Sequence, residues 1–144
     1  MPTGSHLNKT LTGLAGEFSV AAKLCLQGFV ASLTFKNYPG VDIFCFDPAT
    51  NRLARVQVKT ITGGVDYFLP EHIDPEGPSY AFVRFIESQP EFYILPASAV
   101  EAISTAARNR FLAAHPKVNP VQPRMISIGE IGEYRDSWHH IAFR

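Results

Sequence analysis

Hydrophobic and polar positions change their spacing several times along this chain, and each change marks an expected element. Over residues 7–27 the apolar side chains recur three and four positions apart, which predicts an amphipathic helix that ends at Gly28. Short apolar runs rich in β-branched and aromatic residues then predict strands at residues 29–35, 41–46, 53–61, 80–86 and 92–95. A second helix is expected to open at Pro96, with Ser98 in a position to cap it, and to run to residue 114.

The remaining segments complete one domain. Residues 63–79 form a loop rich in Gly, Pro and acidic side chains, and short strands are expected at 67–69 and 125–128. The tail carries the only tryptophan, Trp138, which we expect to dock against the core or the edge of the sheet. The element order predicts an α/β or α+β fold over residues 7–144, with a mixed central β-sheet flanked by helices, after a lead-in at residues 1–6.

Composition and charge narrow the class of protein. The formal net charge of the 144 residues is zero, which argues against a generic nucleic-acid coat protein. Basic side chains nevertheless outnumber acidic ones over residues 1–60, whereas acidic ones dominate residues 61–100. No apolar run approaches the length of a transmembrane helix, and the N-terminus lacks the features of a signal peptide. We therefore expect a cytoplasmic protein in which Cys25 and Cys45 are buried, reduced thiols.

Residues 41–60 are the most informative part of the chain. The turn residues at 47–51 lie between two strand-like runs and predict a hairpin. Asp42 stands at the start of the first strand of this hairpin. Gln57 and Lys59 share one face of the second strand, because side chains two positions apart point the same way. A carboxylate, a neutral oxygen donor and a lysine that meet across a hairpin can hold a hard cation beside a phosphate.

Each of these residues also has a plain structural interpretation. Glu17, an acid on the apolar stripe of the first helix, could pair with Lys23 or face solvent. Asp42 could serve the turn before it, and Gln57 and Lys59 could lie on an open face of the sheet. The apolar neighbours on both strands, however, make the hairpin look buried on both faces. Because buried charges need partners, a shared functional site explains these residues more economically.

Several segments carry a resemblance to a known family. They are GLAGEFSVAAKL at residues 13–24, GVDI at 40–43 and VQVKT at 56–60, followed by FYILP at 92–96 and YRDSW at 134–138. In this order and spacing they resemble the PD-(D/E)xK nuclease superfamily, and its small bacterial and Holliday-junction-resolvase-like members in particular. The resemblance covers most of the chain and implies a restriction-endonuclease-like α-β-β-β-α-β core.

The resemblance also implies roles for the site residues. By matching position, Glu17 resembles the helix acid of the family, Asp42 its metal-binding aspartate and Lys59 its motif lysine. Gln57 occupies the slot of the second motif acid, a departure found in one active branch that includes intron-encoded homing endonucleases, whereas other branches lose catalysis when the motif erodes. The implied cofactor is Mg²⁺ or Mn²⁺, held by Asp42, the Gln57 side-chain oxygen and the Val58 carbonyl.

The resemblance assigns chemistry and partners as well. Glu17 would bind a second ion or a metal-bound water, and Lys59 would orient the attacking water or stabilise charge on the phosphate. The candidates for contacts to backbone phosphates are Lys23, Lys36, Arg52 and Arg55, although each could equally belong to a solvated face.

Three functional interpretations remain open. The first is a metal-dependent DNA endonuclease of the homing, restriction or junction-resolving kind. It would act on duplex or branched DNA as a homodimer or higher homo-oligomer, with no membrane partner. The second is a non-catalytic module of the same fold that binds nucleic acid or protein. The third is a structural domain in which Asp42, Gln57 and Lys59 form only an internal polar network. Glu17, Asp42 and Lys59 occurring together favours the nuclease, and Gln57 with the zero net charge argues against it.

Overall fold

The computed structural model describes residues 8–35, 38–119 and 123–144. Its centre is a sheet in the order β1-β2-β3-β5-β6. These strands are β1 (Val30–Leu33), β2 (Ile43–Asp47), β3 (Arg52–Thr62), β5 (Ser79–Ile86) and β6 (Gln89–Leu95). Strands β3 and β5 are parallel and the other neighbours are antiparallel, so the predicted mixed sheet is confirmed.

A second, two-stranded sheet lies against the first. It consists of β4 (Asp66–Leu69), which lies in the crossover from β3 to β5, and β7 (Arg124–Ser127), which follows the second helix. The connection between the two parallel strands therefore contains a strand rather than a helix. Short 3₁₀ turns over residues 128–140 then bring the chain back across the central sheet, and Trp138 packs on Phe92 with ring centroids 5.3 Å apart.

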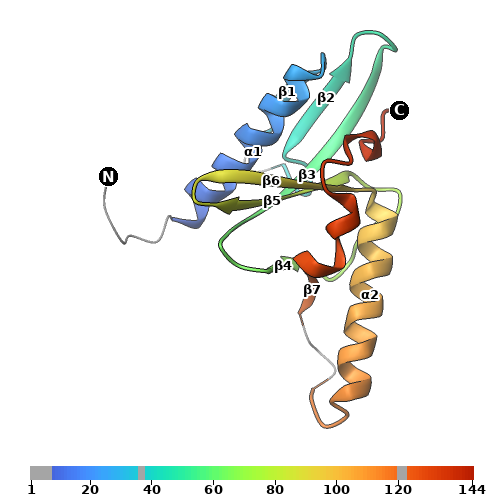
Figure 1. The fold of residues 1–144 in the computed structure, drawn as a ribbon. Helices are drawn as coiled ribbons and strands as arrows, with labels where there is room; N and C mark the ends of the chain where they lie inside the picture. The colour runs from blue at the N-terminus through green and yellow to red at the C-terminus, as the bar shows by residue number, and fades with distance from the viewer. Residues whose placement is uncertain (1–7, 36–37, 120–122) are drawn as a thin grey trace.

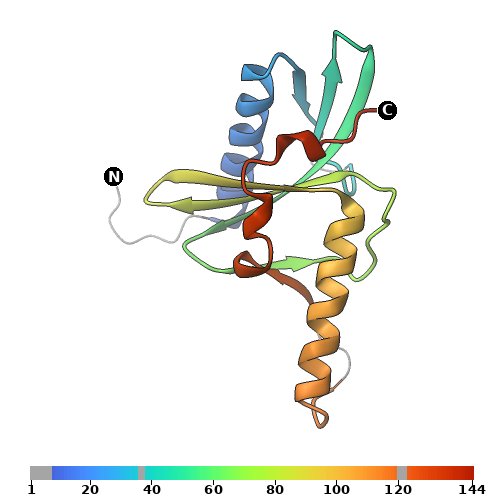
Figure 2. The same cartoon turned by 45° about the vertical axis from the view of Figure 1, so that its right-hand side comes forward.

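The two long helices cover opposite faces of the central sheet. Helix α1 (Lys9–Leu26) packs with Val20 and Leu24 on the face that carries Val56 and Val58. Helix α2 (Ala97–Ala114) covers the other face, together with the β4–β7 pair. Figures 1 and 2 show this arrangement, with α1 beside the β1–β3 end and α2 beside β7. The sheet is thus the middle layer of a mixed α+β fold.

A close approach of α1 to β3 fixes the position of the helix. A Cβ atom at Gly16 would collide with Oγ1 of Thr60, so only glycine permits this spacing between helix and strand. The contact brings the residue after it, Glu17, to the neighbourhood of the β2–β3 hairpin.

Most predicted elements are confirmed with boundaries shifted by a few residues, and three details are corrected. Ser98 lies inside α2, whose N-cap is Pro96 without a side-chain cap bond, so Ser98 does not cap the helix. The β5–β6 turn lies at Glu87 and Ser88, which both have positive φ, so β6 begins earlier than expected. Cys25 is exposed rather than buried, whereas Cys45 is a buried free thiol as expected.

Two further expectations concern the ends and the environment of the chain. The predicted lead-in at residues 1–6, and the predicted start of the first helix at residue 7, lie outside the described residues. Within the described residues, neither helix is long and apolar enough to cross a membrane.

Candidate active site

The β2–β3 hairpin sets the position of Asp42. Its turn is closed by Asp47, whose carboxylate accepts bonds from the Ala49 amide at 2.9 Å and the Thr50 hydroxyl at 2.8 Å. The register pairs Ile43 with Val56, so the residue before Ile43 lies beside Gln57. The predicted turn therefore sets a register in which the Asp42 carboxylate and the Gln57 amide lie side by side.

The Asp42 carboxylate is held by two donors. Its Oδ2 accepts a hydrogen bond from Gln57 Nε2 at 2.9 Å and another from the Val58 amide at 2.7 Å. Burial raises the pKa of Asp42, while the Val58 hydrogen bond and the charge of Lys59 act in the opposite direction. Asp42 is therefore a partly desolvated carboxylate whose charge the surrounding groups only partly stabilise.

The edge of β3 at Val58 faces the same carboxylate. Strand β2 pairs with β3 only as far as Val56, whose carbonyl accepts from the Asp42 amide at 2.9 Å. Beyond that point the backbone of β3 on this side is not covered by β2. Because the N–H and C=O of one strand residue point to the same side, the Val58 carbonyl also lies toward Asp42. This edge adds a backbone oxygen to the site.

Glu17 reaches the site from the helix. Glu17 and Asp42 line one pocket of about 260 Å³ between α1 and the segment that joins β1 to β2. The other lining residues are Lys9, Thr10, Gly13, Leu14, Thr34, Phe35 and Tyr38. Asp42 thus accepts hydrogen bonds from Gln57 and Val58 of β3 and also lines the pocket that Glu17 lines from α1.

Lys59 lies on the same face of β3 as Gln57, as predicted. Val56 and Val58 point into the core beneath α1, so the alternate residues face the other side of the sheet, where Gln57 pairs with Tyr80 and Lys59 with Phe82 in the register. Within the described part of the chain, Lys59 forms no ion pair. Its charge nevertheless favours the ionised form of Asp42 against the larger effect of burial, and the pKa of Tyr80 is raised first by burial and then by the Asp42 charge.

Gln57 thus bonds the Asp42 carboxylate and Glu17 lines the same pocket, whereas Lys59 lies on the face of β3 opposite α1 and does not line that pocket. No group of three His, Cys, Asp or Glu side chains that could hold a metal occurs among the described residues. At this site the two carboxylates, Asp42 and Glu17, are accompanied by the amide of Gln57 rather than by a third acid. A cation here would have to use the Gln57 oxygen and the Val58 carbonyl beside the two carboxylates.

The predicted phosphate-contacting residues are dispersed. Lys23 lies in the last turn of α1 with its amine 5.8 Å from the centre of the Phe92 ring. Arg52 is exposed at the far end of the hairpin, and Arg55 bonds the Glu76 carbonyl at 3.5 Å. Lys36 lies outside the described residues. None of these described side chains lines the Asp42 pocket.

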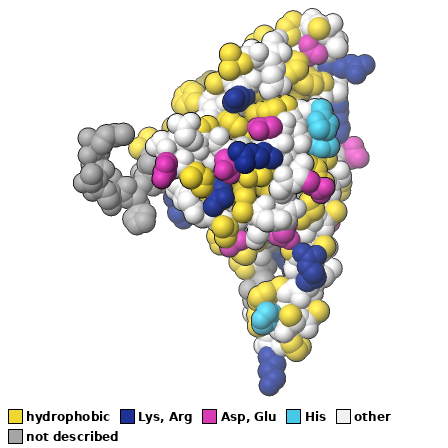
Figure 3. Space-filling view, viewed as in Figure 1, with side chains coloured by type: hydrophobic (Ala, Val, Ile, Leu, Met, Phe, Trp, Pro, Cys, Tyr) yellow, Lys and Arg dark blue, Asp and Glu magenta, His cyan; other side chains and the backbone are white. Residues whose placement is uncertain are grey.

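The surface does not carry a broad basic patch on the face displayed in Figure 3, where Lys and Arg side chains alternate with Asp and Glu. This arrangement agrees with the zero net charge of the chain. A contact with a polyanion would therefore depend on a few local cations rather than on the overall field of the molecule.

Four residues near the site were not singled out in the sequence. Lys9, Thr34 and Tyr38 line the Asp42 pocket, and Tyr80 lies beside Gln57. The helical spacing of Lys9 could have been noticed, since it lies two turns before Glu17 and so shares its side of α1. The other three reach the site through strand pairing and loop course, which local patterns do not specify.

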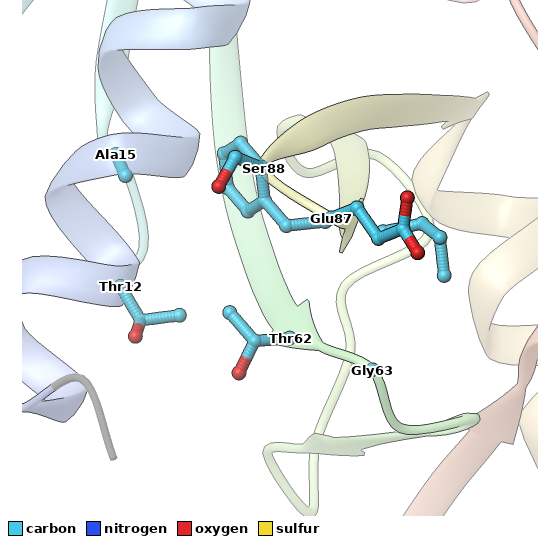
Figure 4. Close-up of a pocket in the computed structure, with 8 residues that line it drawn as sticks. Thr12, Ala15, Thr62, Gly63, Glu87 and Ser88 are labelled. Carbon is cyan, nitrogen blue, oxygen red and sulfur yellow. The ribbon is translucent and has the colours of Figure 1, made fainter. Parts of the chain in front are cut away.

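A larger pocket of about 560 Å³ lies elsewhere, between α1 and the β5–β6 turn (Figure 4). Thr12 and Ala15 face it from the helix and Thr62 from the end of β3, while the Glu87 carboxylate points away from α1. Its walls are mainly apolar and hydroxyl groups. Its lining contains no carboxylate pair and no lysine, in contrast to the Asp42 pocket.

Comparisons with known proteins bear on the fold. A scan against protein-family models and a search of curated proteins find no match. Among solved structures, the chain is similar to a bacterial homing endonuclease, I-Ssp6803I, with 15% sequence identity and a TM-score of 0.55. The similarity covers 92% of this chain and 89% of that chain. It therefore extends over nearly all of both molecules and shows a nuclease-like fold.

Proposed function

We propose that this protein is a Mg²⁺- or Mn²⁺-dependent DNA endonuclease with a PD-(D/E)xK-type site in which Gln57 replaces the second acid. The observation that carries the proposal is the convergence of separate segments on Asp42. Gln57 and the Val58 amide bond its carboxylate, and Glu17 from α1 lines the same pocket. The fold shared with a bacterial homing endonuclease supports the assignment to DNA cleavage.

The donor atoms suit a hard cation. They are oxygens only: the carboxylates of Asp42 and Glu17, the Val58 carbonyl and the Gln57 side-chain oxygen. Both described hydrogen bonds to the Asp42 carboxylate end on Oδ2, so Oδ1 is available as a ligand. When bound, the metal would polarise a phosphate oxygen and lower the pKa of a bound water.

Gln57 would have to turn before it could act as a ligand. Its Nε2 now faces Asp42, and its Oε1 lies toward Gly40, where an added Cβ would be 4.0 Å away. Rotation of the amide about its last bond exchanges the two atoms and presents Oε1 to the shared position. The neutral amide adds no charge, so we expect weaker metal binding than a site with a third carboxylate would have.

Three charged side chains would have separate roles beside the metal. Lys59 would orient the attacking water or donate to the phosphate oxygen on which negative charge develops. Glu17 would hold a second ion or a water on the helix side of the pocket. Lys9, on the rim of the same pocket, is the best placed cation for a neighbouring phosphate.

The partner we propose is DNA, duplex or branched, in a homing, restriction or junction-resolving role. A homodimer or a higher homo-oligomer is expected, because cutting both strands of a duplex requires two sites and each chain supplies one.

A metal titration by calorimetry tests the site without depending on the choice of substrate. The wild-type protein should bind Mg²⁺ or Mn²⁺, and Asp42→Asn should abolish the heat of binding while the fold, checked by circular dichroism, is unchanged. Arg52→Ala, at the far end of the hairpin, is the matched control and should bind as the wild type does. Equal binding by wild type and Asp42→Asn would contradict the assignment of Asp42.

One observation favours a second candidate, a non-catalytic module of the same fold. The Gln57–Asp42 hydrogen bond already satisfies part of the site within the protein, as expected of an eroded motif. Such a module would show no metal-dependent heat at all in the titration, yet could still bind DNA or a protein.

A further inference from the structure

An aromatic groove adjoins the Asp42 pocket. It has a volume of about 470 Å³ and is lined by Ser32, Leu33, Thr34, Phe35, Tyr38 and Phe44. Thr34, Phe35 and Tyr38 line the Asp42 pocket as well, so these three residues form the wall between the two hollows. A ligand in the groove would therefore lie next to the Asp42 pocket.

The aromatic rings in this wall are unusually exposed. The side chain of Phe35 is 92% exposed and that of Tyr38 is 54% exposed. Tyr38 has an aromatic neighbour, Phe44, with ring centroids 5.8 Å apart at an interplanar angle of 67°. A nearly fully exposed phenylalanine contributes little to the core, and together with Tyr38 and Phe44 it makes this groove a contiguous apolar surface.

Hydrogen bonds tie the segment that carries these two residues to the backbone around Asp42. The Thr34 amide donates to the Asp42 carbonyl at 2.9 Å, and the Thr34 hydroxyl donates to the Val41 carbonyl at 2.6 Å. The Tyr38 amide donates to the Phe35 carbonyl at 2.9 Å, which draws the two aromatic residues together. The segment that carries Phe35 and Tyr38 is therefore held close to Asp42.

The chemistry of the two hollows together describes one kind of ligand. The Asp42 pocket combines carboxylates with Lys9, which suits a phosphate accompanied by a cation. The adjoining groove offers flat aromatic faces, which suit a planar, uncharged ring. A nucleotide joins such a ring to a phosphate, but bases in an intact duplex are stacked inside and cannot reach an aromatic side chain on the protein surface.

We propose that Phe35 and Tyr38 receive an unstacked nucleobase next to the phosphate that is cut, so that the protein prefers DNA with an unpaired nucleotide at the cleavage position. The inference rests on the proposed nuclease function and narrows its substrate class. Bulged, mismatched, branched or flapped DNA would satisfy it, whereas a perfectly paired duplex would first have to release a base.

Fluorescence of 2-aminopurine tests the inference separately from cleavage. The analogue is placed as a single bulged nucleotide in one short duplex and opposite thymine in a paired duplex of the same sequence, and both are titrated in EDTA. Wild-type protein should bind the bulged duplex about tenfold more tightly and quench its emission, because stacking on an aromatic side chain contributes on this scale. Phe35→Ala should lose both the preference and the quenching.

The matched control is Phe68→Ala, which removes another exposed aromatic ring, on β4 and outside both hollows. This variant should behave as the wild type. Equal affinity of wild-type protein for the two duplexes, or an unchanged preference in Phe35→Ala, would overturn the inference. A self-association that Phe35→Ala abolishes in light scattering would also overturn it, since the wall would then be an interface between copies.

Failure of the inference and failure of the nuclease function give different results. If the protein cuts paired and bulged DNA equally well, the function stands and the base-stacking groove is wrong. If it binds bulged DNA preferentially but cuts nothing in Mg²⁺, the groove stands and the catalytic assignment is wrong.

Discussion

Asp42 is a single side chain whose burial should lower the stability of the folded protein at neutral pH. Its carboxylate is partly buried, and burial raises its pKa above the ordinary value of 3.8. A raised pKa means that the folded protein binds the proton more tightly than the unfolded chain does. The stability associated with this group is therefore greatest below pH 3.8 and is lost as the pH rises through the folded-state pKa.

Asp42→Asn should consequently stabilise the protein at neutral pH while removing its function. The Asn oxygen, placed where Oδ2 lies, can still accept from both the Val58 amide and Gln57 Nε2. We expect a gain of about 1 kcal/mol at pH 7, the common scale for stabilising substitutions at functional positions. Urea unfolding over a pH series measures it. The gain should shrink toward low pH, and a gain independent of pH would contradict the role of the charge.

Gln57→Glu tests the proposal that Gln57 stands in the position of a second metal-binding acid. It would bring a second carboxylate within hydrogen-bonding distance of Asp42, so metal binding should tighten, because ligand charge raises affinity for hard cations. Without metal the two carboxylates should repel one another, and the variant should unfold at a lower temperature than wild type. Melting curves with and without Mg²⁺ measure both effects. A variant with neither weaker apo stability nor a larger Mg²⁺-dependent rise in Tm would contradict the shared-site geometry.

At the scale of elements, the contact between α1 and β3 positions Glu17. Gly16→Ala would force a methyl group against Thr60, and overpacking of this kind costs about 1–3 kcal/mol. Gly13→Ala is a natural control, since a Cβ there meets nothing within 4 Å and alanine is the better helix former by about 1 kcal/mol. We expect Gly16→Ala to lower Tm and Gly13→Ala to raise it. The same direction for both would mean that helix propensity, rather than the close approach, decides.

The elements themselves follow largely from local patterns. The β2–β3 hairpin could be predicted because Asp47 and Asn51 carry turn chemistry that needs no tertiary partner, and Asn51 adopts a φ of 59°. The position of Cys25 could not be predicted, because the apolar stripe of a helix does not show which of its flanks meets the sheet. Tertiary contacts also bring Thr34 and Tyr38 to Asp42, and no local pattern encodes them.

At the scale of the whole molecule, the candidate site lies between two apolar clusters. One cluster lies between α1 and the sheet, and the other lies beneath α2 and the β4–β7 pair. Strand β3 separates the two clusters, so Gln57 and Lys59 can be partly buried without interrupting either of them. The fold itself is similar to that of a homing endonuclease at 15% sequence identity, with a TM-score of 0.55.

Assembly is a prediction at the same scale. If the protein cuts both strands of a duplex, it should form a homodimer or a higher homo-oligomer, because each chain supplies one Asp42 site. Light scattering at high micromolar concentration, with and without DNA, measures the mass. A monomer under both conditions would contradict double-strand cleavage by paired sites and leave only nicking or the removal of branched strands.

The central claim is that the Asp42 cluster hydrolyses DNA with the aid of a divalent metal, and nicking of a supercoiled plasmid tests it most directly. Wild-type protein should nick the plasmid in Mg²⁺ and not in EDTA, and Asp42→Asn should be inactive. Lys59→Ala should fold normally but cut roughly 100-fold more slowly or worse, since its charge would act mainly in the transition state. Equal activity of all three proteins would identify a contaminating nuclease. No cleavage of duplex, branched or single-stranded DNA would contradict the account.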